Sequence, residues 1–100
     1  IDPTTVIAQM QGATIFALTA LIHGAIEFEG GGVRQSNFHD YRLLSLADTP
    51  PVGVTLVESG AELGGIGECG VPTTIPAVLN ALYDATGQRV RSLPLGGWSV

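Results

Sequence analysis

The chain has 100 residues, with four basic residues against nine acidic ones, which gives a formal net charge of −5. So few and so dispersed basic residues exclude nucleic-acid binding, and one cysteine excludes both a disulfide framework and a cysteine-rich metal or iron–sulfur site. Apolar residues make up 45% and charged residues 13%, which is typical of one packed domain at most and not of a disordered tail.

The chain begins at Ile1, so we expect it to be a piece of a longer protein whose site it helps to complete. No signal-peptide pattern is present, and the compartment stays open.

A long helix is predicted from the N-terminus to Gly24. Asp2 is a suitable capping residue, and Pro3 suits the first helical position. Polar residues interrupt the apolar stretch 6–22, and it is shorter than the roughly 20 residues that a membrane span needs. We therefore expect a helix buried in a larger body, because its apolar residues cover more than one side. One apolar stripe consists of Val6, Met10, Ala13, Ala17 and Leu21.

Strands are predicted in the middle of the chain. Residues 25–29 and 33–36 alternate around a glycine turn, which indicates a β-hairpin. A helical turn is predicted at 43–47, and a further strand at 52–58.

The second half contains a glycine-rich loop and a helix. Residues 60–70 include five glycines, which indicates a sharp turn or a close approach of the backbone to another group. The last helix is predicted from about Thr74 to Thr86, with Gly87 as its stop and Trp98 in the tail as a packing anchor. The fold class is therefore α+β: a buried N-terminal helix, a hairpin and further strand, a glycine-rich loop and a C-terminal helix.

Residues 65–70 match the dinucleotide-binding pattern G-x-G-x-x-G. In such sites the motif directly joins a strand to a helix, and an acidic residue about 20 positions later binds the ribose. The first condition is not met, because six residues separate the predicted strand at 52–58 from the motif, and no acidic residue follows Asp84. Nucleotide binding is therefore the weakest of the functions considered.

Glu68 is the more informative residue of this loop. It has no basic neighbour in the sequence and lies between glycines shortly before a helix. Two interpretations stay open: a carboxylate bound by the free amides of the helix start, or a general base in uncrowded surroundings. Cys69 is expected to be a small buried side chain, and the pair His39-Asp40 to be structural, because neighbours in sequence do not face each other in regular elements. No metal site made within this chain alone is expected.

Taken together, several segments resemble the C-terminal part of molybdenum hydroxylase large subunits, the xanthine dehydrogenase and aldehyde oxidase superfamily. Within it, the isoquinoline 1-oxidoreductase and nicotinate dehydrogenase beta subunits are the most similar branch. The resemblance extends over residues 3–95. It is carried by Ala8-Gln9-Met10-Gln11-Gly12, the strand Gly24–Glu29, Gln35-Ser36-Asn37-Phe38-His39-Asp40-Tyr41, Gly65-Ile66-Gly67-Glu68, Thr86-Gly87 and Arg89-Val90-Arg91-Ser92-Leu93-Pro94-Leu95.

The resemblance implies an oxidoreductase that hydroxylates an aldehyde or N-heteroaromatic carbon with oxygen from water. Glu68 takes the place of the general base, Gln9 that of a residue bound to the molybdopterin cofactor, and Gly65 and Gly67 would let the backbone lie close to the metal site. The cofactor is expected in its cytosine dinucleotide form. The remainder of the large subunit and an iron–sulfur subunit are the implied partners, and residues 1–100 are a fragment of the molybdopterin-binding catalytic domain.

Two features depart from the family pattern. The family commonly has proline after the catalytic glutamate, whereas this chain has Cys69. Most of the cofactor-binding sequence also lies outside these residues, so the isolated chain is expected to bind no molybdenum and to be inactive. The alternative function is a non-catalytic structural or assembly fragment that completes a partner subunit.

Overall fold

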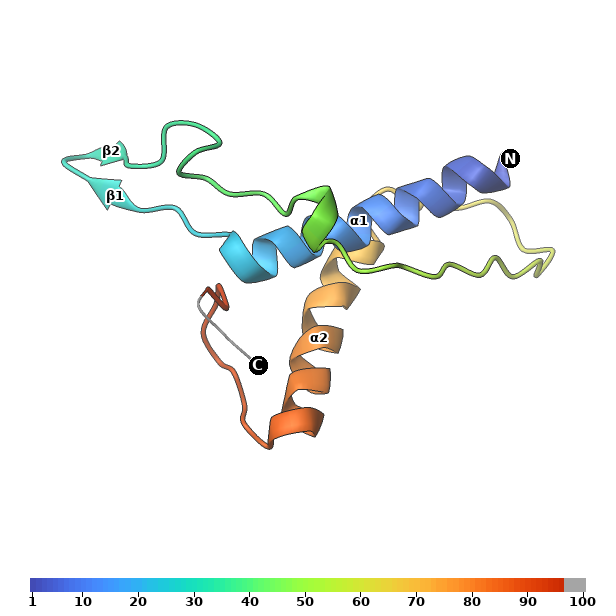
Figure 1. Ribbon diagram of the computed structural model, residues 1–100. Coiled ribbons are helices and arrows are strands. Elements are labelled where there is room, and N and C mark those ends of the chain that lie inside the picture. Colours follow the sequence, from blue (N-terminus) through green and yellow to red (C-terminus); the bar gives the residue numbers. More distant parts are fainter. Residues whose placement is uncertain (97–100) are drawn as a thin grey trace.

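A computed structural model describes residues 1–96 of the chain. Two helices and a small antiparallel sheet give the α+β class that the sequence predicts. In chain order the elements are α1 (Pro3–His23), β1 (Phe28–Glu29), β2 (Gly32–Val33), the 3-10 turn η1 (Leu46–Asp48) and α2 (Gly70–Thr86) (Figure 1).

Helix α1 has the bounds that its caps predict. The Asp2 carboxylate accepts hydrogen bonds from the backbone amides of Thr4 and Thr5 at 3.1 and 3.3 Å. Pro3 is the first helical residue, where its missing amide costs no hydrogen bond. At the other end, the amide of Gly24 donates to the carbonyl oxygen of Ala20 at 2.9 Å.

By length and composition alone, α1 could cross a membrane. It has 21 residues, and its mean hydropathy reaches 1.5, so the expectation that it is too short to span is wrong. Core helices of soluble proteins and signal sequences meet the same criteria. Polar side chains of α1 bond to other parts of the chain: Gln11 Nε2 donates to the Val52 carbonyl at 2.9 Å, and Thr19 Oγ1 accepts from the Leu44 amide at 3.3 Å. These bonds favour a helix packed inside a protein.

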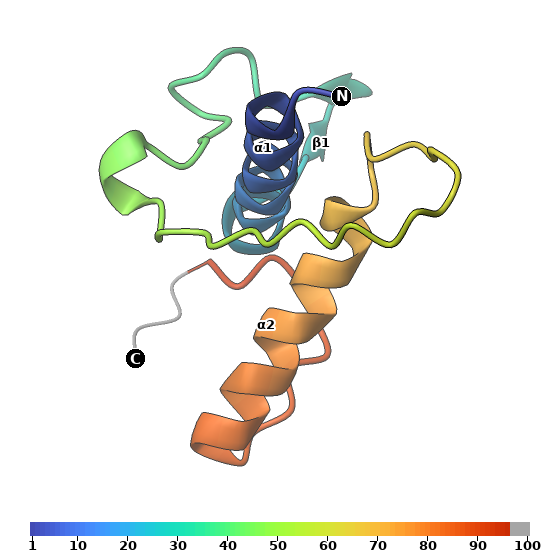
Figure 2. The ribbon, with the colours of Figure 1, turned by 90° about the vertical axis from the view of Figure 1, so that its right-hand side faces the viewer.

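Helix α2 descends steeply from the middle of α1 (Figures 1 and 2). The residues of α1 that are buried, Ala13, Ala17 and Leu21, all belong to the predicted apolar stripe. Helix α2 begins at Gly70, four residues before the predicted start. Pro76 therefore lies in the helix interior, where it removes one backbone hydrogen bond, and not in the first turn. Gly87 ends α2 in the left-handed conformation, at φ 71°, as predicted.

The hairpin is confirmed, although its strands are shorter than expected. Glu29 pairs with Gly32 around a two-residue turn in which Gly30 and Gly31 have φ values of 58° and 83°. Two positive φ angles are typical of the turn that matches the twist of a hairpin, and glycine adopts them without strain. The helical turn expected at 43–47 is the 3-10 turn at Leu46–Asp48.

The strand predicted at 52–58 is wrong. This segment is extended and runs beside α1, but it pairs with no strand within residues 1–96 (Figure 1). A strand exists only where a neighbour accepts and donates its backbone hydrogen bonds. The alternating apolar residues of this segment therefore indicate an extended backbone, but they do not indicate pairing in a sheet.

The described part of the chain is extended, with a radius of gyration of 16.4 Å and dimensions of 53 × 35 × 25 Å. A compact domain of 100 residues has a radius of gyration of about 13 Å. Within residues 1–96, Ala13, Ala17 and Leu21 are the only buried apolar side chains. The core is therefore too small for an independent domain. The predicted anchor Trp98 lies outside the described residues.

Candidate functional site

The glycine-rich loop and the start of α2 form a cleft against the middle of α1. Its volume is about 520 Å³. Most of its lining is apolar, and no basic residue contributes to it. The lining residues are Gln9, Gly12, Ala13, Phe16, Gly67, Glu68, Val71 and Pro72.

Two of the predicted site residues are in direct contact. The Gln9 side chain donates a hydrogen bond from Nε2 to the Gly67 carbonyl oxygen at 2.9 Å, across 58 positions of sequence. Since a carbonyl oxygen only accepts, the amide nitrogen of Gln9 must face it. The structure therefore joins Gln9 to the loop that carries Glu68.

Glu68 contributes an exposed carboxylate to the cleft. Its side chain makes no hydrogen bond or ion pair with any residue from 1 to 96, and no side chain caps α2. The interpretation in which Glu68 is held by the amides of the helix start therefore has no supporting bond in the described structure. The carboxylate is available to a group outside this chain.

Gly65 and Gly67 are not required by the backbone conformation, because neither has a positive φ. A Cβ on either residue would meet no atom within 4 Å. Gly67 lines the cleft, whereas Gly65 does not. If a glycine is needed at these positions, the reason must come from a group that approaches from outside the described residues.

Cys69 directly precedes α2 and is exposed, so the expectation of a buried side chain is wrong. Its sulfur lies 3.7 Å from Met10 Sδ and donates to the Ile66 carbonyl at 3.6 Å. The next turn is closed by the Val71 amide, which donates to the Glu68 carbonyl at 3.0 Å. These contacts fold the loop back onto α1.

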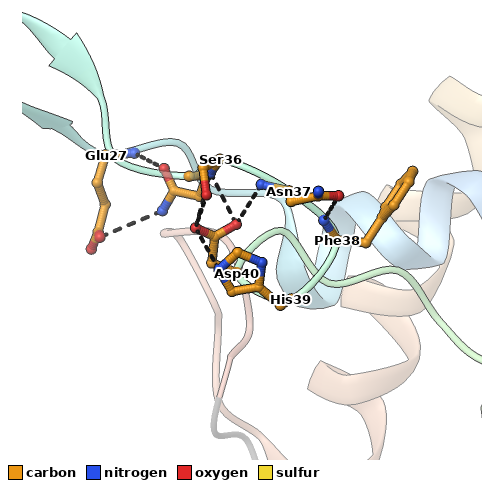
Figure 3. Close-up of polar contacts among 7 residues, drawn as sticks. Glu27, Ser36, Asn37, Phe38, His39 and Asp40 are labelled. Atoms are coloured by element: carbon orange, nitrogen blue, oxygen red, sulfur yellow. Dashed lines mark hydrogen bonds and ion pairs between the residues drawn. The ribbon is translucent and has the colours of Figure 1, made fainter.

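His39 and Asp40 lie far along the chain from this cleft, next to the hairpin (Figure 3). Their side chains approach to 3.5 Å between Nε2 and Oδ2, although sequence neighbours were not expected to face each other. The expectation fails because this segment is a turn and not a regular element. His39 is exposed, and the Asp40 carboxylate binds backbone amides of Asn37 and Ser36.

These amide bonds hold the Asp40 turn together. Asp40 accepts from the amides of Asn37 and Ser36 at 2.9 Å each. The bonds from the Asn37 amide and then the Ser36 amide lower the pKa of Asp40 from 3.8 to about 2, and His39 adds a smaller effect. A carboxylate bound in this way stays ionised and has a structural role, as the sequence predicts.

Metal and dinucleotide sites find no support in the described part of the chain. Residues 1–96 contain no group of three His, Cys, Asp or Glu side chains that could hold a metal ion. The G-x-G-x-x-G pattern follows an irregular segment, and its last glycine is the first residue of α2. The strand on which a dinucleotide-binding loop depends is missing there.

Phe16, Val71 and Pro72 also line the cleft, and none of them is among the site residues predicted from the sequence. Phe16 is the largest of the three. Its side chain is 67% exposed and lies on the same wall as Gln9. A signal for it existed: Gln9, Gly12, Ala13 and Phe16 follow the i, i+3, i+4, i+7 spacing of one helix face. This spacing places Phe16 on the same helix face as Gln9.

The chain is similar to three characterised oxidoreductases. It is 38% identical over 94 residues to the beta subunit of isoquinoline 1-oxidoreductase from Brevundimonas diminuta, which is 94% of this chain. It is 32% identical over 95 residues to a membrane-bound aldehyde dehydrogenase [pyrroloquinoline-quinone] of Gluconacetobacter polyoxogenes. It is 28% identical over 96 residues to the B subunit of nicotinate dehydrogenase from Pseudomonas putida, and both of these matches cover 95% of this chain.

The match covers a small part of each relative. The chain spans 12% of the first two proteins and 8% of the third. No family model matches the chain, and no solved structure matches it. The resemblance to isoquinoline 1-oxidoreductase and nicotinate dehydrogenase beta subunits is thereby confirmed over nearly the whole of this chain.

Proposed function

Since the chain is homologous to these oxidoreductase subunits, we propose that it is the C-terminal part of a molybdenum hydroxylase large subunit. In the complete enzyme it would take part in the oxidation of an aldehyde or N-heteroaromatic carbon, with oxygen from water. Glu68 is the proposed general base. The remainder of the large subunit and an iron–sulfur subunit are the proposed partners.

One observation carries this proposal: an exposed carboxylate without a partner in residues 1–96 lines a mostly apolar cleft. A general base must be ionised and must have free space for the group whose proton it takes. The neighbouring apolar surface of Phe16, Val71 and Pro72 suits the body of an organic substrate. Glu68 therefore combines the chemistry and the access that a base needs.

The residues present are compatible with a molybdopterin cofactor at this cleft. Gln9 uses Nε2 toward Gly67, and its amide oxygen makes no hydrogen bond within residues 1–96, so it remains free for such a group. The open space at Gly65 and Gly67 allows close approach of the backbone. When bound, molybdopterin would supply the redox and oxygen-transfer chemistry. Because no basic side chain lines the cleft, the phosphates of its cytosine dinucleotide form would bind elsewhere in the large subunit.

The names of the relatives do not agree on a cofactor. The aldehyde dehydrogenase carries pyrroloquinoline quinone in its name, and the other two names specify none. The choice of molybdopterin therefore depends on the sequence resemblance described above. Metal analysis of the purified parent enzyme tests it directly.

The test of the base is Glu68→Gln in the complete enzyme. We expect a loss of roughly 10²–10⁴-fold in turnover of aldehydes or N-heteroaromatics, because a general base contributes about that much. Molybdenum content should be unchanged. The matched control is Glu62→Gln, which neutralises another exposed carboxylate of the same glycine-rich segment outside this cleft. Turnover within a few-fold of the parent for Glu68→Gln would contradict the assignment.

A second function, a structural fragment that completes a partner subunit, is favoured by the exposed apolar surface. Phe28, Leu46 and Val57 are more than three-quarters exposed, at 77%, 91% and 82%. Together with ten further large apolar side chains that are exposed, they give the described residues more exposed apolar surface than a small buried core of three side chains accounts for. If Glu68→Gln retains both turnover and molybdenum, this structural function becomes the better description of the segment.

A further inference from the structure

We infer that Gln9 is a positioning residue for Glu68, because it holds the peptide group from which the Glu68 carboxylate is aimed into the cleft. The inference rests on the proposed function, in which Glu68 is the base. It assigns to Gln9 a task within the protein, in addition to any contact with a cofactor.

The side chain of Gln9 holds the peptide unit on the N-terminal side of Glu68. The carbonyl oxygen that Gln9 binds belongs to the peptide bond between Gly67 and Glu68. A peptide unit is planar, so holding its oxygen also orients the amide and the Cα atom of Glu68. The Gln9 amide therefore acts on the backbone of the base itself.

The start of α2 holds the peptide unit on the C-terminal side of Glu68. The Glu68 carbonyl oxygen accepts a hydrogen bond from the Val71 amide at 3.0 Å, within the turn that begins α2. Both peptide planes that meet at the Cα of Glu68 are thus held. One is held locally by the helix start, and the other by the side chain of Gln9, which lies 58 positions from Gly67 in the sequence.

The segment directly before Glu68 is rich in glycine. Gly64, Gly65 and Gly67 have no side chains to pack, and a Cβ on any of them would meet no atom within 4 Å. Glycine loses more conformational freedom on folding than any other residue. Within residues 1–96, the other hydrogen bond to a carbonyl on this side of the loop is the weak one from Cys69 Sγ to Ile66, at 3.6 Å.

Helix α1 supplies a matched comparison. Gln11 lies two positions from Gln9 and also donates from Nε2 to a backbone carbonyl at 2.9 Å, that of Val52. Val52 does not line the cleft. The two bonds have the same donor, type of acceptor and length, although that of Gln11 is partly buried and that of Gln9 is exposed, and of the two only the bond of Gln9 is made to the peptide unit of Glu68.

The test uses Gln9→Met and Gln11→Met in the complete enzyme, each with and without Glu68→Gln. Methionine has a similar length, suits a helix and cannot donate the hydrogen bond. For Gln9→Met we expect kcat per bound molybdenum to fall about tenfold or more with KM unchanged, because small misplacements of a catalytic group are costly. In the Glu68→Gln background the same substitution should cost nothing further, since the two residues act as a unit.

A second measurement does not depend on activity. Amide hydrogen exchange of residues 66–71 should accelerate in Gln9→Met and stay unchanged in Gln11→Met. Equal kcat per bound molybdenum in Gln9→Met and the parent, unchanged exchange, or equal losses with and without Glu68→Gln would each overturn the inference. If Glu68→Gln alone keeps turnover within a few-fold, the proposed function fails, whereas a silent Gln9→Met beside an inactive Glu68→Gln defeats only the inference.

Discussion

Gly70 and Ala13 approach so closely that a Cβ placed on Gly70 would lie 2.9 Å from the Cβ of Ala13. Real Cβ atoms essentially never come that near, so any larger residue at position 70 would force a shift where α2 begins against α1. Gly70 is also the residue at which the loop with Glu68 ends. The crossing of the helices therefore determines where the candidate base lies relative to the cleft.

Gly70→Ala should destabilise the complete enzyme. The added methyl group overpacks the crossing, which costs about 1–3 kcal/mol in a packed interior. Thermal or denaturant unfolding measures the loss. The control is Gly12→Ala: Gly12 lies inside α1 with open space around it, and alanine in a helix interior is about 0.5–1 kcal/mol more favourable than glycine. Gly70→Ala combined with Ala13→Gly should recover part of the lost stability, because glycine at position 13 itself costs about 0.5–1 kcal/mol inside α1. A double variant that is less stable than Gly70→Ala alone by more than this cost would contradict the assigned contact.

Cys69→Pro should be tolerated and slightly stabilising. Cys69 has φ −61°, which lies within the range that proline requires, and its amide donates no hydrogen bond within residues 1–96. A compatible proline stabilises by about 0.4–1 kcal/mol because it restricts the unfolded chain. Unfolding midpoints and turnover of the complete enzyme test this. Lost turnover would show that the contacts of Cys69 with Met10 and Ile66 are needed, or that Glu68 has a backbone conformation that a following proline forbids.

Asp40→Asn should alter the acid sensitivity of the turn beside the hairpin. The pKa of Asp40 is lowered to about 2 in the folded chain, from 3.8, by amides that bind its ionised form. The stabilisation is therefore complete above the unfolded pKa and is lost as the pH falls from about 4 to about 2. The unfolding midpoint of the complete enzyme, measured across this pH interval, should fall less steeply for Asp40→Asn than for the parent. Asp48→Asn, at a carboxylate that accepts one hydroxyl bond from Ser45, is the control.

Residues 1–100 produced alone should not fold cooperatively and should bind no molybdenum. Three buried apolar side chains within residues 1–96 do not offset the conformational entropy of a chain of this length. Circular dichroism during thermal unfolding should show a broad, non-cooperative loss of helix, together with binding of hydrophobic dyes. A sharp two-state transition would contradict this prediction and would indicate self-association or a more complete core.

The limits of α1, the end of α2 and the turn of the hairpin could be predicted because each depends on a few consecutive residues. Asp2 and Pro3 are residue types preferred at the first positions of a helix, and Gly87 ends one by adopting a left-handed conformation. The pair Gly30-Gly31 sets the hairpin turn in the same local way. The family resemblance could also be read from the sequence, since it depends on consecutive residues.

The tertiary structure decided what depends on residues far apart in the chain. The start of α2 at Gly70 follows from its contact with Ala13, and the segment 52–58 has no partner strand within the described residues. The bond between Gln9 and Gly67 joins positions that no periodicity or spacing relates. Local propensity is a property of neighbouring residues, whereas packing and long-range hydrogen bonds depend on where the chain returns, and only the folded molecule determines that.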